Sequence, residues 1–224
     1  MILSLDTSGP LFSIAILSKD SLEQRKFIAN KENSERMIIE IQILLKTLSL
    51  TLNDISGVAF GSGPGSFSGV RVACGIAYGI AFAKKLPING VNTLEALAEL
   101  NPKQSTISCI DARMNQVYLG AFEPINNELS IKGDFGVYDP LKLPKLKLRK
   151  PIIVGSGVKI YMKELKRHYD ELTPYYDEEN YPLASVIAKI SQNRFKKDFN
   201  LANATPVYIR NKVADTIIER ERGK

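Results

Sequence analysis

The sequence is poor in the side chains on which many enzymes depend. Among its 224 residues there is one histidine, there are two cysteines, and tryptophan is absent. The single histidine, His168, lies in the charged segment KELKRHYDE, which is typical of a solvated helix. No serine or cysteine has the sequence context of a catalytic nucleophile, so a Ser-His-Asp or Cys-His enzyme is not expected. A zinc site built from several histidines is excluded for the same reason.

Long apolar runs are also missing. No stretch approaches the roughly 20 apolar residues that span a bilayer. Met1 leads directly into the apolar Ile2–Leu5, which does not resemble a signal peptide. Cys74 and Cys109 lie in apolar stretches, where free cysteines act as small buried side chains in a reducing compartment. We therefore expect a cytoplasmic protein without membrane contact.

The charge balance is moderately basic. The formal net charge is +6 and the isoelectric point is near 9.2. This allows an acidic partner such as RNA but is less extreme than in most ribosomal or chromatin proteins. The segment Leu141–Lys150 carries five positive charges and no negative one. It fits either a phosphate-facing patch or an exposed edge segment on which lysine blocks aggregation.

The stretch Val58–Gly90 predicts a strand, a glycine-rich loop, a helix and the next strand. The loop Gly61–Ser66 interrupts regular structure, and Ser66 or Ser68 is placed to cap a helix over Gly69–Lys85. This order is the βαβ pattern of an α/β protein. The loop has neither the lysine of a P-loop nor the spacing of a dinucleotide fingerprint, so we interpret it as structural.

Two helices in the first half have more apolar surface than one sheet needs. The helix over Gly69–Lys85 is apolar on all sides, so we expect it to be covered nearly all round. Its interior Gly75 and Gly79 each cost about 1 kcal/mol relative to alanine, which is worthwhile only where another backbone comes close. That backbone belongs either to the chain's own sheet or to a partner subunit. The helix Glu35–Thr47, capped by Asn33 or Ser34, has a similar excess.

Together the two helices favour a helix-mediated subunit contact that buries on the order of 800 Å² per partner. The residues assigned to this predicted interface are Met37, Ile38, Ile41, Leu44, Leu45, Arg71, Gly75, Tyr78, Gly79 and Phe82.

The order of strands repeats along the chain. Ile2–Leu5 ends in Asp6, and Thr106–Ile110 ends in Asp111, 105 residues later (111 − 6). Each aspartate is followed by a turn and a further strand, so we expect two similar halves, 1–103 and 104–224. The other expected strands are Leu11–Leu17, Ser21–Ile28, Ile88–Val91, Val117–Phe122, Leu129–Ile131, Phe135–Val137 and Ile152–Val154. Pro206–Arg210 is expected to be a short extended piece, and the other expected helices are Leu94–Leu100 (capped by Thr93), Val158–Tyr169 and Leu183–Phe195.

These tandem β-β-β-α-β-α halves resemble the actin-like superfold of actin, heat-shock ATPases and sugar kinases. The resemblance implies an α/β protein of two RNase H-like halves, with mixed sheets, flanking helices and a truncated second half. In that class the turns after the two aspartates face nucleotide phosphates and metal, and a glycine pair lies against the adenosine. It implies a degenerate nucleotide or ligand site at Asp6, Ser8, Asp111, Arg113, Gly155 and Gly157. The alternative function on this basis is a small ATPase or kinase that uses Asp6 and Asp111.

Five ordered blocks carry a more specific resemblance, to the bacterial TsaB (YeaZ) family. They are Leu5–Ser8, Phe60–Arg71, Gly90–Ala98, Ile110–Tyr118 and Pro206–Ala214. The resemblance implies a non-catalytic subunit needed to form threonylcarbamoyladenosine at position 37 of tRNAs that read codons beginning with A. It would act as scaffold and activator of the transferase TsaD, pairing through its first two helices.

The resemblance also implies that TsaE joins the assembly, that tRNA binds transiently, and that the chain alone forms homodimers through the same surface. No cofactor is expected in this chain, because ATP and metal belong to the partner proteins. The H-x-x-x-H metal pair of TsaD-type sequences is missing, and Asn33 stands where relatives often carry histidine. A glycoprotease-type metalloprotease is therefore disfavoured.

Overall fold

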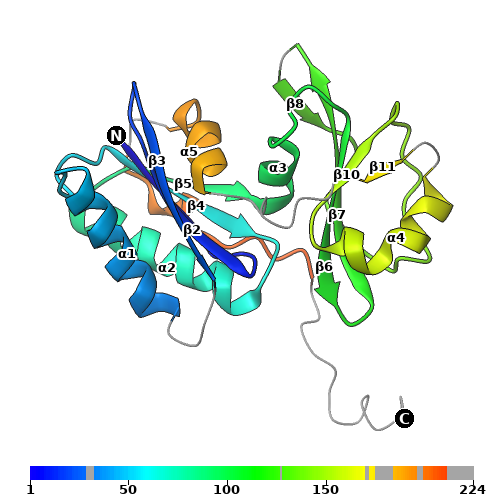
Figure 1. Ribbon diagram of the computed structural model, residues 1–224, viewed down its shortest axis with the longest axis horizontal. Coiled ribbons are helices and arrows are strands. Elements are labelled where there is room, and N and C mark those ends of the chain that lie inside the picture. The colour runs from blue at the N-terminus through cyan, green and yellow to red at the C-terminus, as the bar shows by residue number, and fades with distance from the viewer. Residues whose placement is uncertain (29–32, 127, 170–171, 175–183, 196–198, 211–224) are drawn as a thin grey trace, which may run out of the picture.

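The computed structural model describes residues 1–28, 33–126, 128–169, 172–174, 184–195 and 199–210. Two β-sheets lie next to one another, each with helices packed on its faces (Figure 1). Among these residues no helix has the length and apolar character that crossing a membrane requires.

The first sheet has the strand order β3-β2-β1-β4-β5. Its strands are β1 (Ile2–Asp6), β2 (Leu11–Leu17), β3 (Leu22–Ile28), β4 (Gly57–Gly63) and β5 (Ile88–Asn92). The first three pair antiparallel and confirm the predicted meander, while β4 lies parallel to β1 and β5 parallel to β4. Because parallel strands need a crossover, α2 (Phe67–Lys84) joins β4 to β5.

The second sheet repeats this order as β8-β7-β6-β10-β11. In addition, β9 pairs with Val117–Leu119 near the start of β7. Its strands are β6 (Thr106–Arg113), β7 (Gln116–Ile125), β8 (Glu128–Ile131), β9 (Gly136–Tyr138), β10 (Ile152–Val154) and β11 (Thr173–Pro174). As in the first sheet, the first two strands, β6 and β7, are antiparallel. The strand β10 is parallel to β6, as β4 is to β1. The repeated topology confirms two RNase H-like halves.

The second half is shorter because residues 139–151, all of them described, contain no helix. The first half has α1 (Asn33–Thr47) at the corresponding place. Within the basic segment Leu141–Lys150, Leu143 is buried and Leu146 and Leu148 pack on the same core. The segment belongs to no strand, and its charged side chains are exposed. It therefore covers the second core in place of a helix and does not form a sheet edge.

One face of each sheet is covered by helices from the same half. The helices α1 and α2 pack on the first sheet around Leu3, Leu5 and Phe60. On the second sheet, α4 (Gly157–His168) packs around Ile107 and Cys109. Both cysteines are buried and free, and burial raises the pKa of Cys109 to about 12, as expected for inert core residues.

The other face of each sheet is covered by a helix from the opposite half. The helix α3 (Thr93–Ala98) follows β5 in the chain but packs on β6 and β7. In return, α5 (Ala184–Gln192) packs on β1, β2 and β4 of the first sheet. The Ser4 hydroxyl donates to the Ala184 carbonyl at 2.6 Å, and the Ala184 N–H donates to Ser13 Oγ at 2.9 Å. Figure 1 shows both helices between the sheets. The boundary at residue 103 stays a prediction.

Several element boundaries differ from expectation. The helix α2 begins at Phe67, with Ser66 as its N-cap, and α3 is capped by Asn92 where Thr93 was expected. The strand β6 runs through Asp111 to Arg113, because the hairpin turns later, at Met114-Asn115. His168 is exposed at the end of α4, with its Nε2 atom 2.9 Å from the Leu141 carbonyl oxygen. The expectations for Leu183, Asn211–Ala214 and the Asn33 side chain lie outside what the structure describes.

Candidate functional site

One face of α2 is open to solvent. Arg71, Gly75, Tyr78, Gly79 and Phe82 recur at helical spacing, and all five are exposed. The opposite face, which includes Ala73, Ala77 and Ala81, is buried against the sheet. The expectation that α2 is covered nearly all round is therefore wrong within this chain. Its small buried residues pack against the sheet, whereas its larger side chains Tyr78 and Phe82 face solvent.

The two glycines on this face are not required by the chain's own packing. A Cβ atom built on Gly75 or Gly79 meets no atom of the described residues within 4 Å. By contrast, a Cβ atom on Gly69 would collide with the Thr7 carbonyl oxygen. Next to the open glycines, the rings of Tyr78 and Phe82 stack with centroids 6.2 Å apart. The glycines thus form a shallow strip that another backbone could approach.

The helix α1 supplies a second part of this surface. Ile38, Ile39 and Ile43 are 48%, 53% and 39% exposed. Of these three, Ile38 belongs to the predicted interface, whereas Ile39 and Ile43 do not. The remaining predicted residues of α1 lie inside the chain's own core: Met37, Ile41, Leu44 and Leu45 are at most 7% exposed. The accessible set, called here the α1–α2 surface, is Ile38, Ile39, Ile43, Arg71, Gly75, Tyr78, Gly79 and Phe82.

Asp6, at the end of β1, is sealed from solvent. Its Oδ1 atom accepts the Ser8 N–H at 3.2 Å, and its Oδ2 atom has no hydrogen-bond partner among the described residues. Burial raises the pKa of Asp6 to about 7, although nearby Ser8 and Thr7 lower it in part. A Cβ atom at Gly61 would collide with the carboxylate. The glycine loop therefore closes over this aspartate.

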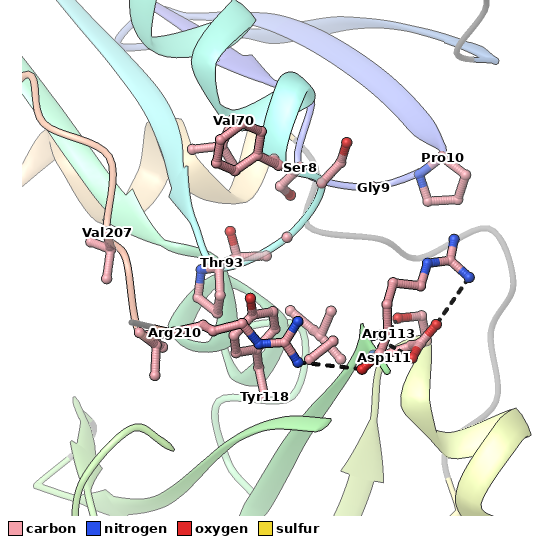
Figure 2. A pocket seen from close by; sticks show the side chains of 18 of the residues that line it. Ser8, Gly9, Pro10, Val70, Thr93, Asp111, Arg113, Tyr118, Val207 and Arg210 are labelled. Carbon is pink, nitrogen blue, oxygen red and sulfur yellow. Dashed lines mark hydrogen bonds and ion pairs between the residues drawn. The ribbon is translucent and has the colours of Figure 1, made fainter. Parts of the chain in front are cut away.

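A cleft of about 830 Å³ opens beyond this point, between the two halves. Ser8, Asp111 and Arg113, three of the six predicted ligand-site residues, line it (Figure 2). Asp111 pairs with Arg113 at 3.2 Å. The hydroxyls of Ser8 and of Thr93, which also lines the cleft, are buried and make no hydrogen bond of acceptable geometry within the described chain.

The remaining predicted glycines do not face the cleft. Gly155, with φ +110°, and Gly157 both press against Cys109, where added Cβ atoms would collide with its carbonyl oxygen or approach its Sγ atom to 2.7 Å. The structure therefore does not place Gly155 and Gly157 in the cleft lining, as the sequence predicted, but against Cys109 of β6. Ser156 between them lines the cleft, and its hydroxyl accepts the Asp111 N–H at 3.0 Å.

Residues 204–210 include the predicted extended piece Pro206–Arg210 and form a strap across the cleft, a position that the sequence did not predict. Cys74 donates its S–H to the Ala204 carbonyl at 3.2 Å, and the Val207 N–H donates to the Ser62 carbonyl at 2.7 Å. At its far end Arg210 donates to the Arg113 carbonyl at 3.3 Å and to the Gln116 side chain. The strap thus contacts both halves. The sequence signals for this segment were the apolar run Val207–Ile209 after Pro206 and the family resemblance of the block Pro206–Ala214.

No cluster of three or more histidine, cysteine, aspartate or glutamate side chains suited to a metal ion occurs among the described residues. With Asp6 enclosed and Asp111 paired, the carboxylates of the predicted ligand site do not meet.

Comparison with known proteins decides the family. The family model for TsaD, described as tRNA N6-adenosine threonylcarbamoyltransferase, matches residues 16–161. The tRNA threonylcarbamoyladenosine biosynthesis protein TsaB of Buchnera aphidicola subsp. Baizongia pistaciae is 30% identical over 224 residues, which cover 93% of this chain and 97% of that protein. The chain belongs to the TsaB family. The resemblance of the five sequence blocks is thereby confirmed.

Other TsaB relatives match a smaller region at higher identity. The Haemophilus influenzae TsaB is 38% identical over 141 residues, 61% of this chain and 58% of that protein, and the match thus spans just over half of this relative. The solved structure of YeaZ from Pseudomonas aeruginosa has a TM-score of 0.78 and 26% identity, and covers 92% of this chain and 98% of that one. The TsaB fold therefore extends along nearly the whole chain.

Proposed function

We propose that this TsaB-family chain is a non-catalytic subunit of the machinery that forms threonylcarbamoyladenosine at position 37 of tRNAs reading codons that begin with A. It acts as a scaffold and activator of a TsaD-type transferase. The names of the relatives support the pathway. The single observation that carries the scaffold role is the α1–α2 surface, which is apolar, exposed and open at two glycines.

The α1–α2 surface is not covered by the rest of the described chain. Glycines inside a helix are unfavourable, and within the described part of the chain no close packing at Gly75 or Gly79 offsets this cost. Three exposed isoleucines and two exposed aromatic rings lie on the same pair of helices. Burying them against a partner's helices would restore both packing and close backbone approach.

The partner set follows from the same proposal. The α1–α2 surface binds TsaD, TsaE joins the assembly, and tRNA is bound transiently. When the chain is alone, two copies pair through the same surface. ATP and metal are held by the partner proteins. The ATPase alternative is disfavoured because the enclosed Asp6 carboxylate is in no position to orient a metal-bound nucleotide.

The test is co-purification of TsaD with Gly79→Leu and, separately, Ile39→Asp. Both positions are exposed, so both variants are expected to fold. Ile41→Asp is unsuitable, because Ile41 is only 4% exposed and a buried charge would unfold the chain. Lys163→Leu on α4 is the matched control, since it adds the same side chain at an exposed helix position elsewhere. Undiminished TsaD binding by folded Gly79→Leu would contradict the proposal.

A further inference from the structure

The rim of the interlobe cleft carries more exposed apolar side chains than its own packing needs. Phe67 and Ile160 are each 55% exposed, Tyr208 is 56% exposed, and all three line the cleft. They come from α2, α4 and the strap, so both halves contribute. Such a concentration at one concave place indicates a contact surface.

The charges around the cleft are mainly positive. Among the described residues that line the cleft, Arg113, Lys159 and Arg210 are basic and Asp111 is the only acidic one. The Asp111 carboxylate is already paired with Arg113 and is only 10% exposed. The first turn of α2, which opens toward the cleft at Ser66–Ser68, contains no acidic residue to offset the helix dipole. The occupant of the cleft is therefore expected to be anionic.

The Arg113 side chain is presented by a strained hairpin. Arg113, Met114 and Asn115 all have left-handed φ values, of 61°, 53° and 53°. This run is unfavourable for residues other than glycine. The Asp111 carboxylate, which accepts the Arg113 N–H at 2.9 Å, and the Arg210 side chain hold it in place. The result is an Arg113 side chain that is 87% exposed at the cleft edge (Figure 2). Strain retained at such a place suggests a role for this tip.

A stack of aromatic rings and a guanidinium lies beside these charges. The Arg71 guanidinium carbon is 3.3 Å from the Phe67 ring centroid and 5.2 Å from that of Tyr208. Both aromatic residues nevertheless keep more than half of their surface exposed. Exposed rings flanked by arginine are the side chains on which unpaired nucleobases stack.

We propose that this cleft rim is a contact surface for single-stranded RNA. Phe67 and Tyr208 stack on bases, and Arg113 and Arg210 bind the neighbouring phosphates. The inference rests on the proposed function, whose substrate is a tRNA. It adds the place at which this subunit touches that RNA.

RNA fits the observations better than an acidic protein does. An acidic peptide would use the cations, but it would leave the ring surface of Phe67 and Tyr208 that Arg71 does not cover without a planar partner. A single strand is favoured over a duplex because its bases are free to stack, whereas a duplex hides them. The cleft is also lined on both sides, which suits a narrow strand.

The test measures binding of the full-length chain to a labelled single-stranded RNA oligonucleotide and to an RNA duplex of the same composition, over a range of salt concentrations. We expect the single strand to bind more tightly. Tyr208→Ala should weaken its binding about tenfold, which is the lower range for loss of one stacked base, and Tyr208→Phe should restore it. Arg113→Gln should reduce the slope of log affinity against log salt by about 0.7.

Two matched controls separate this surface from others. Tyr78→Ala removes an exposed tyrosine from the α1–α2 surface, and Arg167→Gln removes an exposed charge from α4. Neither should change RNA binding. Gly79→Leu should lose TsaD but keep RNA affinity, so failure of the proposed docking and failure of this inference are distinguishable.

The inference is overturned if the parent chain does not bind the single strand even at low salt. It is also overturned if Tyr208→Ala and Arg113→Gln bind as the parent does, or if the duplex binds equally well. Preferential binding of an acidic polypeptide through the same arginines would instead assign the rim to a protein partner, which likewise overturns it.

Discussion

The buried carboxylate of Asp6 makes the stability of this fold depend on pH in an unusual direction. Burial raises its pKa from 3.8 to about 7 in the folded chain. Between these values the folded state keeps a proton that the unfolded state releases. The free energy of unfolding therefore falls as pH rises through this window, and the full penalty is present above about pH 7.

The size of the effect follows from the same shift. The interval from 3.8 to about 7, at about 1.4 kcal/mol for each pKa unit, corresponds to about 4 kcal/mol. Domain stabilities are commonly about 5–15 kcal/mol, so the penalty is large. Asp6→Asn removes the charge and keeps an oxygen that can accept the Ser8 N–H. The variant should be more stable than the parent by up to about 4 kcal/mol near pH 8.

Urea denaturation of parent and variant from about pH 5 to about pH 8 measures this directly. The difference between the two should grow with pH, because contributions from all other groups cancel. Asp54→Asn is the control: hydrogen bonds from Thr51 lower the pKa of the exposed Asp54, so its contribution is lost only at a pH below this range. The difference between Asp54→Asn and the parent should therefore stay constant across the titration. A difference between Asp6→Asn and the parent that stays constant or shrinks with rising pH would refute an enclosed, unpaired carboxyl at the end of β1.

Two further predictions concern residues whose type does not suit their surroundings: glycines inside a helix and a buried hydroxyl group. Replacing Gly75 and Gly79 together by alanine should stabilise the monomer by about 2 kcal/mol, which would raise Tm by about 4–8 °C, and should weaken TsaD binding. By contrast, Gly69→Ala should destabilise the chain, because its Cβ atom would collide with the Thr7 carbonyl oxygen. Calorimetry on dilute protein checks both, and equal effects at buried and open glycines would contradict the packing described. Thr93→Val should raise the free energy of unfolding by about 1 kcal/mol in denaturant titrations, since the Thr93 hydroxyl is buried and has no hydrogen-bond partner among the described residues. A loss of stability would show that the hydroxyl is hydrogen-bonded.

Much of the fold could be predicted because its signals are local. Turn residues separate short apolar runs, so the meander of β1, β2 and β3 and its repetition from β6 were visible in the sequence. The cap at Ser66 and the glycine-rich loop fixed the start of α2 to within two residues.

The site was harder to predict because it depends on contacts between distant residues. Helical spacing showed that α1 has too many apolar residues, but it could not tell that Met37 and Ile41 face inward while Ile39 faces solvent. The glycines at 155 and 157 were assigned to a ligand, whereas Cys109, far away in the chain, explains them. The contact of Phe67 and Tyr208 with Arg71 could not be predicted, because the fold brings the strap next to α2 from far along the chain.

The position of α5 has a consequence for how the protein is made. The first sheet is complete by Asn92, but the face that carries Ser4 and Ser13 is covered by residues from Ala184 onward. On the ribosome, most domains fold as units from the N-terminus while synthesis continues. Here the earliest strands must wait, with one face uncovered, until nearly the entire described chain has emerged. Nascent chains of this protein should therefore need protection until translation is almost finished, and rare codons or pauses before α5 should lower its yield.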